Sequence, residues 1–483
     1  MSFTNVLFFG CFLPAVLIIY WLLHRSLRMQ NVVLLAASFV FYVMFDPRYL
    51  LFLTAVIVIA YAGAIISDRS PSEKGHKKAA VISMACIVLI LVIFKYADFI
   101  VSIVSRSNDH CWGLILPVGL SFYIFQAYTY LYAVMKKEME AEKNFIALAV
   151  FISFFPTIVS GPIQRAKEFL PKLHAERTLS WDNFRACVYR FLWGAFLKMV
   201  IADRVGILVD SVFDYYQYFA GVPLILTACA YSVQLYADFS GYSYMAIAVA
   251  GLFGFPLKEN FHQPYFATSI HAFWSRWHIS LSTWLRDYVY IPLGGNRKGT
   301  ARKYINILIV FLISGIWHGA GFSFIVWGLL HGMYEVIGAM TAGFREKAAA
   351  ALGINRNDAG WKLLQLLFTF MLVTIAWVFF RAPSVGYALG YLRKCAAWNP
   401  WTLFDGSLFE LGLDRQDFMV ALVSIAILIV VSVLRERGFH AVSLARMNIV
   451  TRYAVFLAMV LVIVVFGIYG PSYSAANYIY AGF

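Results

Sequence analysis

Long apolar runs recur along almost the whole chain, and they restrict its fold more than any other feature of the sequence. A helix that crosses a bilayer needs ~20 consecutive apolar residues, and many of the runs approach that length. Others are short or interrupted by Gly and Pro, which is typical of tilted or re-entrant segments. The runs lie at about residues 5–23, 31–45, 49–67, 79–104, 113–134, 144–160, 184–202, 221–237, 241–255, 303–318, 321–341, 361–381, 417–434 and 452–470.

The overall composition leads to the same fold class. Hydrophobic residues make up 61% of the 483 residues and charged residues 13%, whereas soluble domains are about half apolar and a quarter charged. An ordinary soluble enzyme, a collagen, a disordered chain and a disulfide scaffold are therefore excluded. We expect about ten to twelve spans in an all-α polytopic membrane protein, with residues 1–483 forming a single integral-membrane domain.

Positive charge is concentrated in particular connectors. The net charge of +14 is explained by cytoplasmic Lys and Arg and by attraction to anionic membrane lipid, so no nucleic-acid partner is expected. Connectors 24–30 and 68–78 are basic, whereas 46–48 and 105–111 are nearly neutral. The positive-inside rule therefore predicts an N-terminus outside the cytoplasm. Beyond residue 160 the rule leaves the orientation open.

The sequence lacks the common metal-binding and catalytic motifs. Its six cysteines form no CxxC pair, so neither a zinc site nor a disulfide framework is predicted. HExxH, GxSxG and phosphate-loop patterns are also missing. No metal is therefore expected, and the candidates that remain are polar residues within apolar runs.

His318 is the strongest of these candidates. It lies in Ser-Gly-Ile-Trp-His-Gly-Ala-Gly (314–321), which joins two apolar runs. Small neighbours let a backbone or a thin ligand approach the imidazole, and a neutral imidazole can take a proton near pH 7. The residue is either a general base or acyl-transfer residue at the end of a narrow tunnel, or a packing histidine. His331 lies on a different helical face and is interpreted as a core histidine.

Residues 271–299 predict an amphipathic helix that lies at the membrane interface or covers a polar cavity. Its apolar stripe contains Trp274, Trp277, Leu281 and Trp284, and its polar stripe contains His271, Ser275, His278, Ser282 and Arg286. His278 is therefore expected to face other polar groups, either lining a reaction chamber or belonging to an interfacial polar face.

Asp238 places a carboxyl group between two apolar runs. Such a group must be paired or lie in a wet cavity. Lys198, Asp203 and Arg204 are further ionisable residues in apolar surroundings, and they are expected to form internal ion pairs. The sequence does not say which residues pair.

Short motifs that run in order along most of the chain resemble those of the membrane-bound O-acyltransferase (MBOAT) family. The resemblance is greatest to its prokaryotic branch, which includes the membrane subunit of alginate O-acetyltransferase. The motifs are Pro-Val-Gly-Leu-Ser-Phe-Tyr (117–123), Phe-Phe-Pro (154–156), Gly-Pro-Ile (161–163), Asp-Phe-Ser-Gly-Tyr-Ser (238–243), Phe-Trp-Ser-Arg-Trp-His (273–278), Trp-Leu-Arg-Asp-Tyr (284–288), Pro-Leu-Gly-Gly-Asn-Arg (292–297) and Trp-His-Gly (317–319).

The resemblance implies both a fold and a reaction. The fold would be a ring of tilted transmembrane helices, with re-entrant and interfacial helices around a thin central tunnel. The family's invariant histidine maps onto His318, and its second functional position onto His278. Asp238, Ser282, Arg286 and Trp317 would then line the tunnel or cavity. Acetyl-CoA from the cytosol would be the donor, with no bound cofactor, and Arg297, Lys298, Arg302 and Lys303 either meet its phosphates or act as a topology anchor.

The aromatic C-terminal tail, residues 477–483, also resembles a segment of family members or their small partner peptides. Tyr480 matches a tyrosine that is proposed there to carry the acyl group outward, because a phenol can act as a temporary acceptor when a histidine helps to remove its proton. The alternative is an interfacial aromatic anchor. His271-Ala272 and Ala133 depart from the family pattern, which leaves the acceptor and partner open.

The function predicted from this resemblance is an acyltransferase of the bacterial inner membrane. It would relay acetyl from acetyl-CoA towards an exported, alginate-like polysaccharide, with a periplasmic or surface SGNH-type acetyltransferase completing the transfer. Acyl transfer to peptidoglycan or D-alanyl transfer to teichoic acid are alternatives of the same class. A transporter or channel is the alternative from another class, but the two related halves typical of transporters are not apparent.

Overall fold

The computed structural model describes residues 3–105, 111–439 and 441–469, and within these ranges the regular structure is entirely helical. Among the described residues, eight helices are long and apolar enough to cross a membrane: α3 Tyr49–Arg69, α4 Glu73–Ser105, α10 Val222–Leu252, α13 Thr300–His318, α14 Phe322–Met340, α16 Ala359–Arg381, α18 Arg415–Glu436 and α20 Ile449–Phe466. Two shorter apolar helices, Phe8–Leu22 and α2 Leu27–Val43, add to them. The predicted polytopic all-α fold is confirmed.

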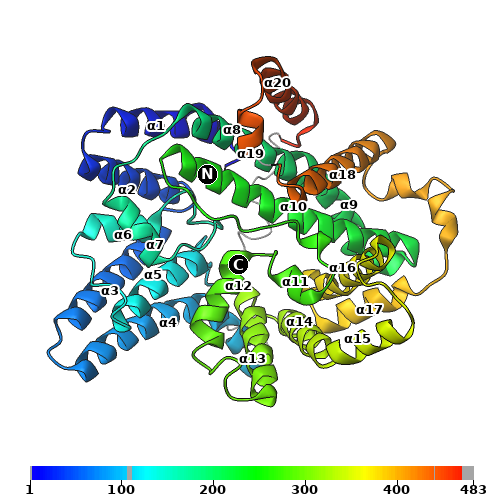
Figure 1. Ribbon diagram of the computed structural model, residues 1–483, viewed down its shortest axis with the longest axis horizontal. Coiled ribbons are helices and arrows are strands. Elements are labelled where there is room, and N and C mark those ends of the chain that lie inside the picture. Colours follow the sequence, from blue (N-terminus) through cyan, green and yellow to red (C-terminus); the bar gives the residue numbers. More distant parts are fainter. Residues whose placement is uncertain (1–2, 106–110, 440, 470–483) are drawn as a thin grey trace.

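Shorter helices connect and surround these spans. They are α1 Leu13–Leu22, α5 Leu120–Met135, α6 Phe145–Ser153, α7 Ala166–Leu173, α8 Trp181–Ala195, α9 Asp203–Phe213, α11 Ile270–Trp274, α12 Ile279–Leu285, α15 Ala342–Ala351, α17 Val385–Cys395 and α19 Ala441–Ala445. Figure 1 shows α11 and α12 near the middle of the view, with α4 and α5, α10, and α13 and α14 arranged around them.

Two apolar runs that the sequence separates form one helix. Residues 221–237 and 241–255 are both contained largely in α10, because Gly241 does not interrupt the helix. Its missing side chain instead allows α8 to approach: a Cβ at Gly241 would lie 2.8 Å from the carbonyl oxygen of Gly194. Similarly, the run at 184–202 continues from α8 through a π-helical turn, Phe196–Ala202, into α9.

Side-chain contacts join the basic connectors into one face of the molecule. They are His76 Nε2 with the Val134 carbonyl at 3.1 Å, Lys167 with Glu138 at 2.9 Å, Lys258 with Glu168 at 2.6 Å and Arg177 with Asn31 Oδ1 at 2.6 Å. These contacts tie the stretch after residue 160 to the connectors that the positive-inside rule places in the cytoplasm. We call this the cytoplasmic face.

The opposite face lies at the start of α10, Val222. The other end of this helix reaches the cytoplasmic face, where Tyr20 donates to the Phe253 carbonyl and accepts a hydrogen bond from Arg177. Arg381 pairs with Asp210 at 2.8 Å and with Asp214 at 3.1 Å, and Asn399 Oδ1 accepts a hydrogen bond from the backbone of Val222.

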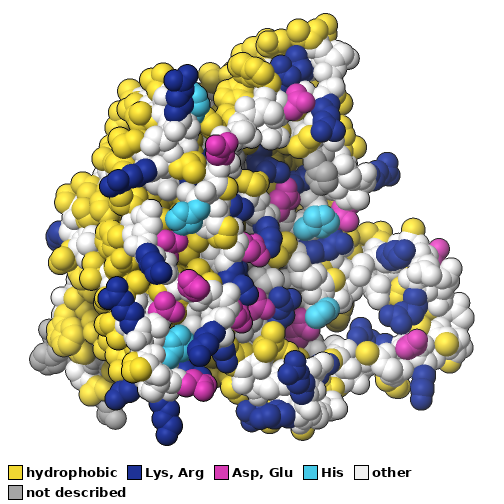
Figure 2. Space-filling view, turned by 60° about the vertical axis from the view of Figure 1, so that its left-hand side comes forward, with side chains coloured by type: hydrophobic (Ala, Val, Ile, Leu, Met, Phe, Trp, Pro, Cys, Tyr) yellow, Lys and Arg dark blue, Asp and Glu magenta, His cyan; other side chains and the backbone are white. Residues whose placement is uncertain are grey.

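Figure 2 shows charged side chains gathered over one face, with hydrophobic side chains along its left-hand edge. This division is expected when the edges face lipid and the ends face water.

Candidate active site

The predicted amphipathic helix is broken at His278, and the break changes where that residue points. α11 ends at Trp274 and α12 begins at Ile279, because His278 has a left-handed backbone with φ +43°. The apolar stripe of Trp274, Trp277, Leu281 and Trp284 is buried as predicted. The expectation that His278 belongs to the polar stripe is wrong, since the turn directs its ring into the protein and leaves it 1% exposed.

A neighbouring amide fixes the tautomer of His278. Its Nδ1 lies 3.2 Å from Asn260 Oδ1, and the same oxygen accepts a hydrogen bond from the backbone of Ser280 at 3.0 Å. Because this oxygen is an acceptor, Nδ1 donates and Nε2 keeps its lone pair. Burial lowers the pKa of His278 to about 3, so the ring is neutral at pH 7. The Phe239 ring packs edge-on at 4.6 Å.

His318 is the last residue of α13 and lies in an aromatic enclosure. Its ring centroid is 4.6 Å from that of Trp317, 4.8 Å from Trp327 and 5.1 Å from Phe380. The glycines around it allow close approach, as predicted, and what approaches is a neighbouring backbone. A Cβ at Gly315 would collide with the carbonyl oxygen of Phe324 in α14.

Trp317 brings the two predicted histidines together. Its indole lies 6.3 Å from His278 and 4.6 Å from His318, measured between ring centroids, and it stacks on Phe125 at 5.5 Å. Sequence reasoning missed Lys95 of α4, whose ammonium donates to the Trp317 carbonyl. The signal for it was a lysine within the apolar run 79–104.

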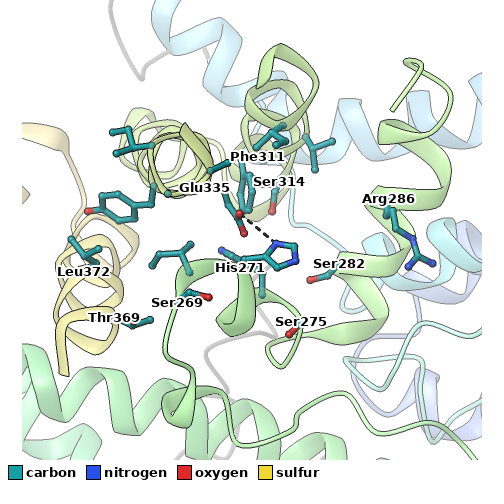
Figure 3. Close-up of a pocket in the computed structure, with 18 of the residues that line it drawn as sticks. Ser269, His271, Ser275, Ser282, Arg286, Phe311, Ser314, Glu335, Thr369 and Leu372 are labelled. Atoms are coloured by element: carbon teal, nitrogen blue, oxygen red, sulfur yellow. Dashed lines mark ion pairs between the residues drawn. The ribbon is translucent and has the colours of Figure 1, made fainter. Parts of the chain in front are cut away.

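The other members of the predicted polar stripe line a cavity of about 1270 Å³ between α11–α12 and α13, α14 and α16. They are His271, Ser275, Ser282 and Arg286. Figure 3 shows His271 directed at Glu335, with which it forms an ion pair at 3.5 Å. Hydrogen bonding to the Glu335 carboxylate raises the pKa of His271. These four residues therefore line a cavity, as the polar stripe predicts, but apolar side chains of α13, α14 and α16 form most of the remaining wall.

The cavity lies towards the cytoplasmic face and extends along α13. Asp287, next to Arg286, pairs with Arg165 of the cytoplasmic stretch at 3.3 Å. On α13 the lining runs from Lys303 to Ser314, about 16 Å along an ideal helix. Ser314 is one helical turn, about 6 Å, before His318.

His318 itself is 2% exposed and is not among the residues that line this cavity. The structure therefore does not place the His318 imidazole at the open end of a tunnel. Trp317, Trp327 and Phe380 enclose the ring, which places a layer of aromatic side chains where an open tunnel was predicted.

Asp238 is paired and does not line the cavity. Lys198 Nζ lies 2.6 Å from Asp238 and 2.8 Å from Asp203, and all three side chains are buried. The ion pairs expected from the sequence are thus confirmed for Lys198 and Asp203, and Arg204 pairs with Asp417 at 3.2 Å. Lys198 is part of the π-helical turn that packs against α10.

Two other predictions concern the basic cluster and the tail. Of the basic cluster, Lys303 lines the cavity, whereas Arg297, Lys298 and Arg302 are exposed. Tyr480 and the rest of the tail 477–483 lie outside the described residues.

Comparison with known proteins connects this arrangement to acyl transfer. Residues 78–380 match the model of the membrane-bound O-acyltransferase family. The chain is 36% identical over 436 residues to the probable alginate O-acetylase AlgI of Pseudomonas putida. The aligned region covers 88% of this chain and 87% of the relative. It is 33% identical to the peptidoglycan O-acetyltransferase of Helicobacter pylori, over 87% of this chain and 83% of the relative.

A more distant relative transfers another acyl group. The teichoic acid D-alanyltransferase of Bacillus subtilis is 28% identical over 235 residues, which covers 45% of this chain and 58% of the relative. Together with the eight apolar helices, these similarities identify a multi-pass acyltransferase of the bacterial inner membrane. The chain belongs to the membrane-bound O-acyltransferase family.

Proposed function

We propose that the protein takes an acetyl group from cytosolic acetyl-CoA and passes it to a hydroxyl group for O-acetylation of an exported polysaccharide. The observation that carries this proposal is a cavity that starts at the cytoplasmic face and reaches Ser314, one helical turn from His318. An intramembrane histidine one helical turn beyond the inner end of such a cavity suits acyl transfer between the two sides of a membrane.

In the proposed reaction His318 is the general base. It removes the proton of an acceptor hydroxyl while the hydroxyl oxygen attacks the thioester carbon. The new ester forms as the carbon–sulfur bond breaks, and His318 returns the proton to the sulfur, so that coenzyme A leaves as the thiol. His278, held in one tautomer by Asn260, orients the acceptor or His318 across the Trp317 ring. The aromatic side chains around His318 must shift to admit the acyl group.

The cytoplasmic end of the cavity has the charge needed for this donor. Lys303, Arg286 and Arg345 all line it, and the phosphates of coenzyme A are anionic groups that Lys and Arg bind well. Glu335 is balanced by His271 at 3.5 Å. This arrangement supports a coenzyme A thioester as the donor, with the acetyl end directed towards Ser314.

The proposed acceptor is inferred from the relatives to which the chain is similar. An alginate-like polysaccharide is favoured because the similarity to alginate O-acetylases covers 88% of the chain; a peptidoglycan acceptor is the second candidate, because the peptidoglycan O-acetyltransferase covers 87%. The final step would belong to a periplasmic or surface transferase of the SGNH type, with Tyr480 as an intermediate acyl carrier. An acetyl adduct on the C-terminal peptide, detected by mass spectrometry during turnover, would support the Tyr480 step.

The test of the central proposal is His318→Ala. We expect loss of polymer acetylation by at least about 100-fold, the scale of general-base catalysis, with normal protein in the membrane. The matched control is His174→Ala, which removes a surface histidine paired with Glu142 on the cytoplasmic face and should leave acetylation unchanged. Wild-type acetylation in His318→Ala would remove this residue from the mechanism.

A further inference from the structure

Several buried hydrogen-bond donors close to His318 have no acceptor among the residues that the structure describes, and three of them lie where α13 crosses α14. These three are Ser314 Oγ, Trp327 Nε1 and His331 Nε2. All three residues are buried: Ser314 is 2% exposed, and Trp327 and His331 are 0% exposed. Proteins pair nearly all buried polar atoms, and an unpaired one in a native structure calls for an explanation such as a ligand. A group of three indicates a place where a ligand atom binds.

His331 acts as a donor in this group because its tautomer is fixed. Its Nδ1 accepts a hydrogen bond from Trp274 Nε1 at 3.2 Å. A neutral imidazole that accepts at Nδ1 carries its proton on Nε2. The indole N–H of Trp327 can only donate, and the Ser314 hydroxyl can donate as well. The missing partner of the group is therefore a hydrogen-bond acceptor.

The three donors come from two helices that cross closely beside the proposed catalytic base. Ser314 is one turn before His318 on α13, and Trp327 and His331 are one turn apart on α14. The Trp327 ring lies 4.8 Å from His318 and 5.2 Å from His331. Neighbours four residues apart share a helical face, so the donors gather around the same crossing as the His318 imidazole.

The cavity proposed to bind the coenzyme A donor, which we call the donor cavity, leads to these three side chains. Ser314 lines the cavity directly, and so do Trp274, which holds His331, and Phe311, whose ring stacks on His331 at 6.2 Å. A molecule that enters from the cytoplasmic face therefore meets Ser314 first. Figure 3 shows Ser314 and Phe311 on α13 next to Glu335, at the wall of the cavity opposite Ser275.

We propose that Ser314, Trp327 and His331 form the pocket that binds the carbonyl oxygen of the acyl group and stabilises its negative charge during transfer. The inference rests on the proposed function, which supplies a thioester as substrate. When the acceptor oxygen bonds to the carbonyl carbon, the π electrons move to the carbonyl oxygen. That oxyanion receives hydrogen bonds from the three donors until the carbon–sulfur bond breaks and the carbonyl re-forms. Donors held ready for a developing oxyanion lower the barrier of acyl transfer.

Two coenzyme A thioethers test the pocket by binding alone. In S-acetonyl-CoA a ketone oxygen is present near the position of the acetyl carbonyl, and in S-propyl-CoA a methylene replaces the ketone carbon. With purified wild-type protein, titration calorimetry should give a dissociation constant about tenfold lower for the acetonyl compound, the scale of a buried hydrogen bond. In Trp327→Phe and His331→Leu the preference should fall towards one, while the affinity for S-propyl-CoA stays at the wild-type value.

Conservative variants separate donor loss from loss of packing. His331→Gln restores an N–H donor near Nε2 and should regain part of the preference that His331→Leu loses. Ser314→Ala should lower the preference and slow acyl transfer, by about 100-fold if its hydroxyl is a full oxyanion donor. The matched control is Ser424→Ala, which removes a buried hydroxyl bonded at 2.6 Å to the Val420 carbonyl of its own helix, and it should change neither quantity.

The outcomes distinguish this inference from the proposed function. Equal affinity of wild-type protein for the two thioethers would overturn the carbonyl pocket and leave the coenzyme A donor standing. An unchanged preference in all three donor-removing variants would also overturn it. Failure of wild-type protein to bind either thioether would overturn the coenzyme A donor itself.

Discussion

Lys95 places an ammonium group within α4, a helix that crosses the membrane. The side chain reaches the Trp317 carbonyl at the end of α13, and Tyr96 donates to the carbonyl of Ile316. The last carbonyls of a helix have no partner within that helix, and in a membrane they cannot rely on water. Two adjacent side chains of α4 thus satisfy the end of α13 directly before His318.

Replacing Lys95 should therefore weaken the site that holds His318. We expect Lys95→Met to lower the free energy of unfolding by about 1–3 kcal/mol, the cost of leaving a buried acceptor without its donor, and to reduce acyl transfer. Thermal unfolding in detergent and polymer acetylation would measure the two effects. Lys77→Met is the control, because Lys77 lies on the same helix in an exposed pair with Glu73, and such pairs contribute little. An unchanged melting temperature for Lys95→Met would contradict this role.

At the scale of elements, the crossing of α13 and α14 depends on two glycines. Gly315 and Gly328 face each other, and a Cβ on Gly328 would collide with the carbonyl oxygen of Phe311. Small residues at such positions let membrane helices approach closely. The crossing carries His318 and Ser314 on one helix and Trp327 and His331 on the other, so its spacing sets the geometry of the candidate site.

A single methyl group at this crossing should separate the helices. Gly328→Ala is expected to lower acyl transfer by tenfold or more, on the order of the loss caused by small misplacements of reacting groups, and to destabilise the fold. Gly386→Ala in α17 is the control, because Gly386 has open space around it and does not line the cavity. It should be neutral or slightly stabilising, since Ala favours helix over Gly. Equal acetylation by the two variants, compared at equal membrane levels, would show that the crossing tolerates expansion.

The sequence predicts the spans better than it predicts their interruptions. Apolar runs mark most of the helices because burial in lipid requires apolar side chains over a whole helix length. The sequence could not show that His278 turns inward, because the helical spacing of Trp274, Trp277, Leu281 and Trp284 continues across the break between α11 and α12. The left-handed backbone at His278 is set by tertiary packing, which periodicity does not report.

The pairing of distant residues was likewise beyond the sequence. Lys198 and Asp238 are ionisable residues in apolar runs, which predicts that each has a partner. Their contact at 2.6 Å depends on α10 lying against the π-helical turn that follows α8. Lys95 carries the same signal, an ionisable residue in an apolar run, but its partner is a backbone carbonyl far away in the chain, which the sequence does not show.

For the whole molecule, the contacts between connectors extend the orientation predicted by the positive-inside rule to the part of the chain beyond residue 160. Arg177 ties the stretch after residue 160 to Asn31, next to the basic connector 24–30. Lys167 ties the same stretch to Glu138, which follows the Val134 carbonyl that contacts His76 of connector 68–78. The donor cavity joins the same face through the pair of Arg165 with Asp287. The connector at 396–414 belongs to the opposite face, where Asn399 binds the start of α10.

This orientation predicts which positions a membrane-impermeant thiol reagent can reach in intact cells. Asp405→Cys, exposed on the opposite face, should react from outside, whereas Arg302→Cys, exposed beside the donor cavity, should react only after the membrane is permeabilised. Lys74→Cys, in the basic connector that the positive-inside rule assigns to the cytoplasm, is the reference for Arg302→Cys and should behave in the same way. Labelling of Arg302→Cys from outside, with Lys74→Cys protected, would place the cavity on the wrong side of the membrane for a cytosolic donor.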